Sequence, residues 1–84
     1  MICHINCFNI SDGKQLHQKL AQLLDFPDWY GYNLDALFDC IAELPSPTRL
    51  YLISWDHTAP WASGFEAVLT DAQESCPELT VVYE

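Results

Sequence analysis

Basic residues are scarce in this chain of 84 residues, since lysine and arginine together number three against twelve aspartates and glutamates. The formal net charge of −9 repels the phosphates of nucleic acids and anionic membrane surfaces, and it attracts a basic partner. Acidic charge that merely keeps a small protein soluble explains the net charge equally well. The placement of the carboxylates along the chain therefore has to decide between these two interpretations.

Long apolar runs and export signals are also missing. No apolar stretch approaches the roughly 20 residues that a membrane-spanning helix needs. The first residues, 1–6, carry neither the basic start nor the small-residue cleavage site of a signal peptide, so we expect a cytoplasmic location. Half of the residues are apolar, which is enough for one hydrophobic core and argues against disorder. We expect one domain over residues 1–84.

Recognisable catalytic patterns are absent. The histidines are scattered along the chain, at positions 4, 17 and 57, with no serine or cysteine in a nucleophile context. His17 is expected to be a partly exposed structural histidine. The three glycines stand alone, so no phosphate-binding loop is present. Asp35 and Asp39 share a helix face, but nothing predicts a pocket or a raised pKa for an acid/base pair. We expect no enzyme activity, no metal and no cofactor.

The four cysteines lack the C-x2-C pairing that is typical of zinc sites. They lie at Cys3, Cys7, Cys40 and Cys76. Cys3 and His4 would point to opposite faces of a strand, which disfavours shared metal ligation. Free, mostly buried thiols are expected in a chain without an export signal. A small redox or metal protein built on these cysteines remains an alternative.

Strands and helices alternate in the hydrophobic pattern. The expected strands cover residues 2–5, 49–54 and 79–83. Asp12 followed by Gln15 is a capping box that begins a helix, and Pro27 ends it near Asp25. A later helix begins near Pro60, is expected to be interrupted at Ser63-Gly64, and continues to about Cys76. Strands separated by helical crossovers predict an α/β fold, with a small three-stranded parallel sheet packed against a layer of helices.

The helix expected from residue 34 to about residue 44 has two contrasting faces. At about 100° per residue, its core side collects four apolar residues, with Cys40 near the edge: Leu34, Leu37, Ile41 and Leu44. Asp35, Asp39 and Glu43 form an exposed acidic stripe, and no lysine or arginine lies between residues 28 and 47 to offset it. Like charges at this spacing destabilise a helix by a few tenths of a kcal/mol per pair. The stripe is either a solvated face or a surface for a cationic partner.

An aromatic loop precedes this helix. Trp29, Tyr30 and Tyr32 surround Gly31, which can take a positive φ, and Asn33 is a favourable N-cap. Aromatic residues with polar atoms are enriched at interface hot spots, so the loop resembles a binding patch. Tyr30 is expected to face the core. The helical periodicity places Phe38 between the core side and the acidic stripe.

The stretch from Phe26 to Cys40 closely resembles the barstar family, with its proline, aromatics, glycine and asparagine followed by Leu-Asp-Ala-Leu, an aromatic residue and aspartate. Weaker similarity extends through the middle strand and the last helix and strand. Barstar-like proteins inhibit barnase-type ribonucleases and have three parallel strands packed against helices. The resemblance thus implies an intracellular inhibitor or immunity protein that forms a 1:1 complex with a basic extracellular-type ribonuclease or a ribonuclease toxin domain.

The same resemblance implies roles for individual residues. Asp39 would take the place of an RNA phosphate, and Asp35 would meet either the cationic rim of the enzyme or its catalytic histidine. The expected partner-binding set is completed by Trp29, Gly31, Tyr32, Asn33, Phe38, Ala42, Glu43, Leu44 and Asp71. Several of these depart from the family pattern, since Tyr32 replaces an acidic residue and Leu44 replaces a tryptophan. A barstar-like adaptor that binds another basic protein through the same acidic face is the alternative.

Overall fold

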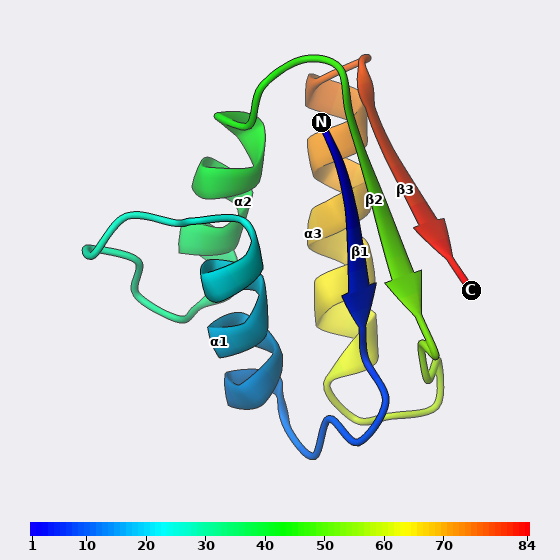
Figure 1. Ribbon diagram of the computed structural model, residues 1–84. Helices are drawn as coiled ribbons and strands as arrows, with labels where there is room; N and C mark the ends of the chain where they lie inside the picture. The colour runs from blue at the N-terminus through cyan, green and yellow to red at the C-terminus, as the bar shows by residue number, and fades with distance from the viewer.

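The computed structural model describes residues 1–84 and shows the alternation of strands and helices that the hydrophobic pattern predicts (Figure 1). Its elements in chain order are β1 (Ile2–Asn6), α1 (Gly13–Leu23), α2 (Leu34–Ala42), β2 (Thr48–Ile53), α3 (Ala62–Ser75) and β3 (Leu79–Tyr83). None of the helices is long and apolar enough to cross a membrane. The predicted α/β class, with a three-stranded parallel sheet, is confirmed.

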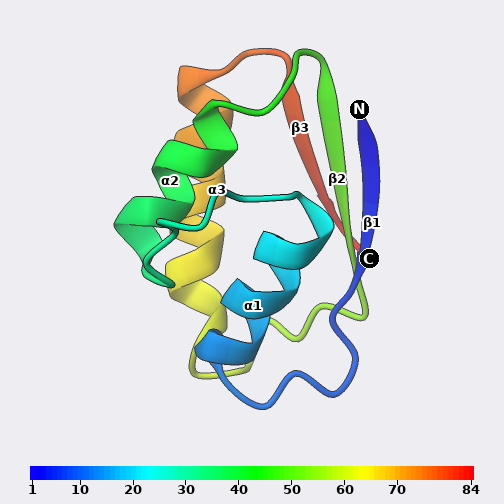
Figure 2. The same cartoon turned by 60° about the vertical axis from the view of Figure 1, so that its left-hand side comes forward.

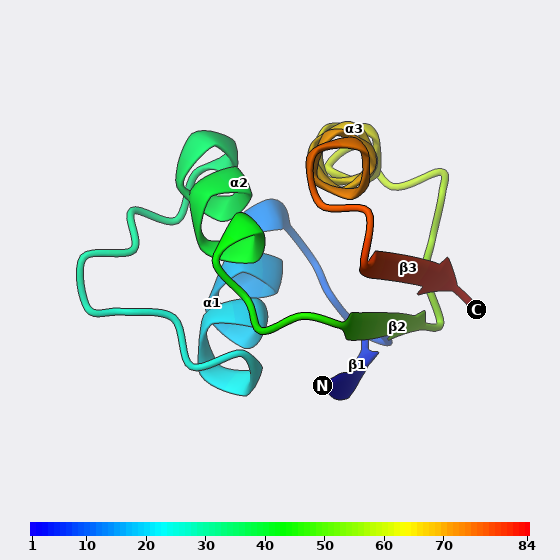
Figure 3. The same cartoon turned by 90° about the horizontal axis from the view of Figure 1, so that it is seen from above.

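The strands are arranged in the order β1-β2-β3, and both neighbouring pairs are parallel. Both crossovers move in the same direction along the sheet, so right-handed connections place every helix on one face. Figures 2 and 3 show all three helices on one side of the sheet, with α1 nearest β1, α3 nearest β3 and α2 farther out. Helix α2 packs along α3 and forms the side of the helical layer farthest from the sheet, where its outer face is available to a partner.

The core lies between the sheet and the helices. Alternate residues of the central strand β2 point into the core. Leu50 and Leu52 are fully buried, whereas Arg49 is exposed. Helices α1 and α3 contribute one apolar face each. The largest fully buried side chains are Ile5, Leu16, Leu20, Leu37, Ile41, Leu50, Leu52 and Leu69. Burial of these apolar surfaces is the main driving force for folding.

The opposite face of the sheet is not covered by any helix (Figure 2). His4 and Tyr51 stack there across neighbouring strands, with ring centroids 4.8 Å apart and planes inclined by 10°. Arg49 donates a hydrogen bond to the Tyr51 hydroxyl over 3.3 Å. The only arginine of the chain therefore lies on the sheet, on the side away from the acidic helix.

Local signals explain where α1 begins and ends. Asp12 accepts a 2.9 Å hydrogen bond from the Gln15 amide, and the Gln15 side chain accepts one from the Ser11 amide over 2.8 Å. This reciprocal arrangement matches the predicted capping box, although Gln15 reaches the residue before the cap. At the other end Asp25 takes a φ of 56°, and this left-handed conformation stops the helix before Pro27.

The expected interruption at Ser63-Gly64 is wrong, because α3 runs unbroken through both residues. A Cβ built on Gly64 would lie 3.0 Å from the Leu34 Cδ1 atom of α2. Gly64 therefore allows α2 and α3 to pack closely. The close packing offsets the low helix propensity of glycine. Propensity alone cannot reveal this use of a glycine.

A larger side chain at residue 64 should force α2 and α3 apart. We expect Gly64→Val to lower the free energy of unfolding by about 1–3 kcal/mol, the usual cost of overpacking. The matched control Ser63→Val, at an exposed position of the same helix, should change it by less than about 0.5 kcal/mol beyond the propensity effect. Leu34→Ala should partly rescue Gly64→Val in urea denaturation. Equal losses for the two valine variants would contradict the packing role.

Candidate partner-binding surface

Helix α2 begins at a well-formed N-cap. Asn33 has an extended backbone, and its side-chain oxygen accepts a 2.8 Å hydrogen bond from the Ala36 amide. This bond satisfies one of the free amide groups of the first turn. Asp35 lies in that turn, where the positive end of the helix dipole favours a carboxylate. The predicted cap is confirmed, and it fixes where the acidic stripe starts.

The acidic stripe of α2 is exposed and has no internal counter-ion. Asp35, Asp39 and Glu43 are all exposed, and the only ion pair in the chain joins His57 to Glu66. No side-chain hydrogen bond engages any of the three carboxylates. Because their spacing is four residues, they follow one another along a single side of the helix. The stripe is thus a row of unneutralised charge.

The remaining candidates on α2 surround the stripe. Phe38 is half-buried and packs against the core, as the periodicity predicts, so its outer edge borders the stripe. Ala42 is exposed at the last helical turn. The helix ends at Ala42 and Glu43 is the C-cap, two residues earlier than expected, so Leu44 lies just beyond it and is half-buried. Cys40 is 4% exposed and belongs to the core side rather than its edge.

Cys40 lies directly beneath the stripe. Burial raises the pKa of its thiol, and the nearby carboxylates of Glu43 and Asp39 raise it further. A raised pKa keeps the thiol protonated at neutral pH and therefore poorly nucleophilic. Cys40 consequently acts as a small apolar core residue behind the acidic face.

The aromatic loop is held by Tyr30, which is 4% exposed and points into the core as predicted. Its hydroxyl lies 2.5 Å from the Nδ1 atom of His17 on α1. Phe26 and Tyr32 pack against the same ring, with centroids at 4.9 Å and 5.3 Å. Tyr30 therefore connects both ends of the loop to helix α1.

The expectation of a partly exposed His17 is wrong. His17 is 6% exposed and lies against the Phe65 ring with centroids 4.7 Å apart. Burial lowers the pKa of His17 and raises the pKa of Tyr30. Both shifts favour neutral partners, so the hydrogen bond between the Tyr30 hydroxyl and Nδ1 joins two uncharged rings. The helical position beside Leu16 gave no sign of this bond, because it depends on a loop that closes over α1.

Gly31 can adopt a positive φ but does not do so, since no glycine in the chain has one. Its neighbour Tyr32 does, with a φ of 54°. A Cβ built on Gly31 would lie 2.8 Å from the Asn33 Nδ2 atom, so glycine is needed here to leave room for the capping side chain. The left-handed conformation of an aromatic residue costs about 1–2 kcal/mol and is typical of functional sites.

Tyr30 turns its neighbours outward. Trp29 is 62% exposed and Tyr32 is 49% exposed, on either side of the buried anchor. Large exposed aromatic side chains are costly in water and are frequent in interface hot spots. With Asp35 following Asn33, the aromatic pair and the start of the acidic stripe form one continuous surface along the chain. We call the loop from Phe26 to Asn33 together with the outer side of α2 the loop–α2 surface.

Asp71 is the one candidate that lies on α3. It is exposed on α3, the helix that packs against α2 (Figure 1). No hydrogen bond or ion pair joins Asp71 to the acidic stripe. The structure therefore places it on a neighbouring element without connecting it to the other candidates.

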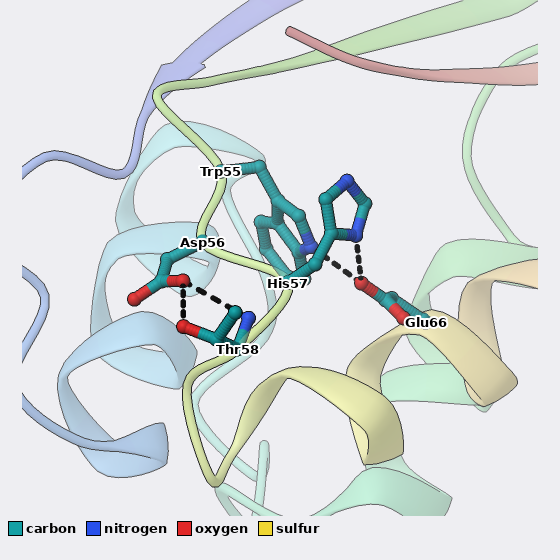
Figure 4. A network of polar contacts seen from close by, with 5 residues as sticks. All are labelled: Trp55, Asp56, His57, Thr58 and Glu66. Carbon is teal, nitrogen blue, oxygen red and sulfur yellow. Dashed lines mark hydrogen bonds and ion pairs between the residues drawn. The ribbon is translucent and has the colours of Figure 1, made fainter.

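The one histidine–carboxylate pair lies elsewhere, between the end of β2 and the start of α3 (Figure 4). Glu66 accepts a 2.7 Å hydrogen bond from the Trp55 indole, and His57 Nδ1 lies 2.7 Å from the same oxygen. The Trp55 bond and then His57 lower the pKa of Glu66. Asp56 similarly accepts bonds from the Thr58 amide and hydroxyl at 2.9 Å and 2.6 Å. The bonds to Glu66 fasten the connecting loop to α3, and those between Asp56 and Thr58 hold the loop itself.

The cysteines are all free, and no three histidine, cysteine or acidic side chains are arranged to share a metal ion. Cys7 and Cys40 are buried, and Cys3 and Cys76 are half-buried. Burial raises the pKa of Cys3 and Cys7.

Comparison with known proteins agrees with this geometry. The family model described as "Barstar (barnase inhibitor)" matches residues 1–84. The chain belongs to the barstar family. It is also 41% identical over 64 residues to "Putative ribonuclease inhibitor YrdF" of Bacillus subtilis strain 168, an alignment that covers 70% of each protein. The resemblance of residues 26–40 to the barstar family is thereby confirmed.

The role of Gly31 in this barstar-family chain can be tested with a double-mutant cycle. We expect Gly31→Ala and Asn33→Ala each to lower the free energy of unfolding by about 1 kcal/mol, because each removes the same N-cap bond. In the Asn33→Ala background Gly31→Ala should cost nothing further, since the backbone there suits alanine. Additive losses in urea denaturation would show that Gly31 acts independently of the cap.

The buried His17 predicts a pH dependence of stability. Its pKa is lower in the folded protein than the ordinary value of 6.5, so the unfolded chain binds the proton more readily. With respect to His17, the free energy of unfolding should be highest above pH 6.5. It should decrease as the pH falls below 6.5, by up to about 1.4 kcal/mol per pH unit. His17→Gln, which can still accept from Tyr30 but does not titrate, should flatten this decrease between pH 6.5 and 5. An unchanged slope would contradict the assignment.

Proposed function

We propose that this protein inhibits a basic, barnase-type ribonuclease by inserting the loop–α2 surface into the active site of the enzyme. The observation that carries the proposal is the acidic stripe of Asp35, Asp39 and Glu43, which is exposed and unneutralised beside a rigidly anchored aromatic loop. A chain that needed charge only for solubility would gain from dispersing it, because neighbouring carboxylates repel each other on a helix. Membership in the barstar family supports the same function.

Asp39 is the proposed mimic of an RNA phosphate. It lies in the middle of the stripe, between Asp35 and Glu43, and no residue of the chain competes for its oxygens. Arginine binds carboxylates and phosphates with the same two-pronged geometry, so a site built to hold a phosphate can hold a carboxylate. Asp35 would meet the cationic rim of that site, and Glu43 would contribute mainly attraction at longer range.

The aromatic loop supplies the contacts that make the fit specific. Trp29 and Tyr32 present exposed rings, and Asn33 presents the end of the α2 cap. Because Tyr30 is bonded to His17, these groups are already ordered before binding, and the entropy lost on association is reduced. The complex would contain one copy of each protein, and the inhibitor would act in the cytoplasm without catalysis of its own. The nuclease itself is either a secreted ribonuclease or the nuclease domain of a toxin.

Opposite net charges should also accelerate the encounter. A chain with a formal charge of −9 steers a basic enzyme toward its acidic face, and salt screens this attraction beyond about 10 Å at 0.1 M. The association rate constant should therefore fall steeply as salt is raised, whereas the dissociation rate constant should change little.

Asp39→Ala tests the phosphate-mimic role. We expect this variant to weaken inhibition of a barnase-type ribonuclease by at least about a hundredfold, because it leaves the buried cations of the enzyme unpaired. Glu74→Ala, at an exposed position on α3, is the matched control and should change inhibition by less than twofold. The measurement is the inhibition constant in an RNA cleavage assay, with circular dichroism to show that both variants are folded.

Two results would contradict the proposal. Full inhibition by Asp39→Ala would show that Asp39 does not mimic a phosphate, although the protein would still be an inhibitor. Failure of the wild-type protein to inhibit any barnase-type ribonuclease, although it binds a different basic protein through Asp35 and Asp39, would favour the adaptor role.

A further inference from the structure

A surface pocket lies beside the loop–α2 surface, at the end of α2. Its volume is about 320 Å³, which is within the range of pockets that accept small ligands. The apolar part of its lining includes Leu24, Phe26 and Leu44. Cys40, which is almost fully buried, also lines it. The pocket is therefore bounded by the end of α1, the start of the aromatic loop and the end of α2.

Two carboxylates belong to the same pocket. Asp25 and Glu43 both line it, both are exposed, and neither has an ion-pair or side-chain hydrogen-bond partner in the chain. No lysine or arginine lines the pocket, but Met1 does, and its ammonium group donates a 2.6 Å hydrogen bond to the Pro47 carbonyl. The pocket thus combines an apolar lining with an excess of negative charge.

We propose that this pocket accepts one arginine side chain of the partner protein. The aliphatic stem of arginine would lie against Leu24 and Leu44, while its guanidinium would meet the carboxylates of Asp25 and Glu43. Guanidinium is planar and weakly hydrated, so it packs on aromatic rings such as that of Phe26. A purely apolar side chain would leave both carboxylates unpaired beside it, and an anionic one would be repelled.

The position of the pocket argues for the same partner that binds the acidic stripe. Glu43 belongs to both, and Phe26 begins the loop that Tyr30 anchors, so the pocket extends the loop–α2 surface without a break. This inference rests on the proposed function, because it assigns a second contact to the same basic enzyme. It differs from the Asp39 contact, because it requires a cavity and not only exposed charge.

The test uses Nα-acetyl-arginine amide as a probe and the ¹⁵N-labelled wild-type protein. We expect amide shifts concentrated at Leu24, Asp25 and Leu44, with half-saturation in the millimolar range. The neutral isostere Nα-acetyl-citrulline amide should bind about threefold to tenfold more weakly. Asp25→Asn/Glu43→Gln should reduce arginine binding to the citrulline level; asparagine tolerates the left-handed conformation of residue 25. Leu44→Trp should fill the pocket and abolish binding.

A charge-matched control separates the pocket from general electrostatic attraction. Glu74→Gln/Glu84→Gln removes two exposed carboxylates elsewhere and should leave the affinity for the arginine probe within twofold of wild type. Arginine shifts confined to Asp35 and Asp39, equal binding of citrulline, stronger binding of the matching lysine amide, or undiminished binding to Leu44→Trp would each overturn the proposal.

The outcome is separable from that of the proposed function. The probe titration requires no ribonuclease, so it tests the pocket even where the nuclease inhibited by the protein is unknown. If Asp39→Ala loses inhibition but the pocket binds no arginine, the inhibitor function would stand and the arginine pocket would be rejected. If the pocket binds arginine but the protein inhibits no ribonuclease, the arginine pocket would stand and a nuclease would be rejected as the partner.

Discussion

The hydrogen bond between the Tyr30 hydroxyl and the His17 imidazole joins the loop–α2 surface to the core. It is short and buried, at 2.5 Å, and it is surrounded by the rings of Phe26, Tyr32 and Phe65. A buried pair of this kind is costly to break, since either polar group left alone loses its hydration without compensation. The loop is therefore ordered from within, and its outer side chains are free to contact a partner.

This anchoring also accounts for the strain in the loop. Tyr32 can hold its left-handed conformation because Tyr30 on one side and the Asn33 cap on the other fix the backbone around it. Tyr32 is half exposed in this conformation, so the strained backbone presents an aromatic ring to a partner. The packing of α2 against α3 at Gly64 fixes the position of the helix that carries the acidic stripe.

Charge is distributed unevenly over the molecule as a consequence. The loop–α2 surface has carboxylates and no lysine or arginine, whereas Arg49 lies on the open face of the sheet. The stripe is thus left without an internal counter-ion. A cationic partner can relieve the repulsion between Asp35, Asp39 and Glu43, and this gain on binding is consistent with a ribonuclease active site as the target.

Periodicity and local capping are sufficient to predict the elements and the exposed side of α2. The stripe and the Asn33 cap follow from helical spacing and from side-chain chemistry within four residues. The errors concern residues whose surroundings come from distant parts of the chain. His17 is buried by a loop thirteen residues away, and Gly64 is explained only by Leu34 of another helix. The pocket beside Leu44 likewise requires three separate segments to meet.

The central claim is that the loop–α2 surface, and no other face, binds the enzyme. Hydrogen–deuterium exchange of the protein with and without a barnase-type ribonuclease measures this directly. We expect binding to protect residues 26–44 and to leave β1 and β2 on the open face of the sheet unchanged. Protection of β1 and β2 with no change between residues 26 and 44 would contradict this claim.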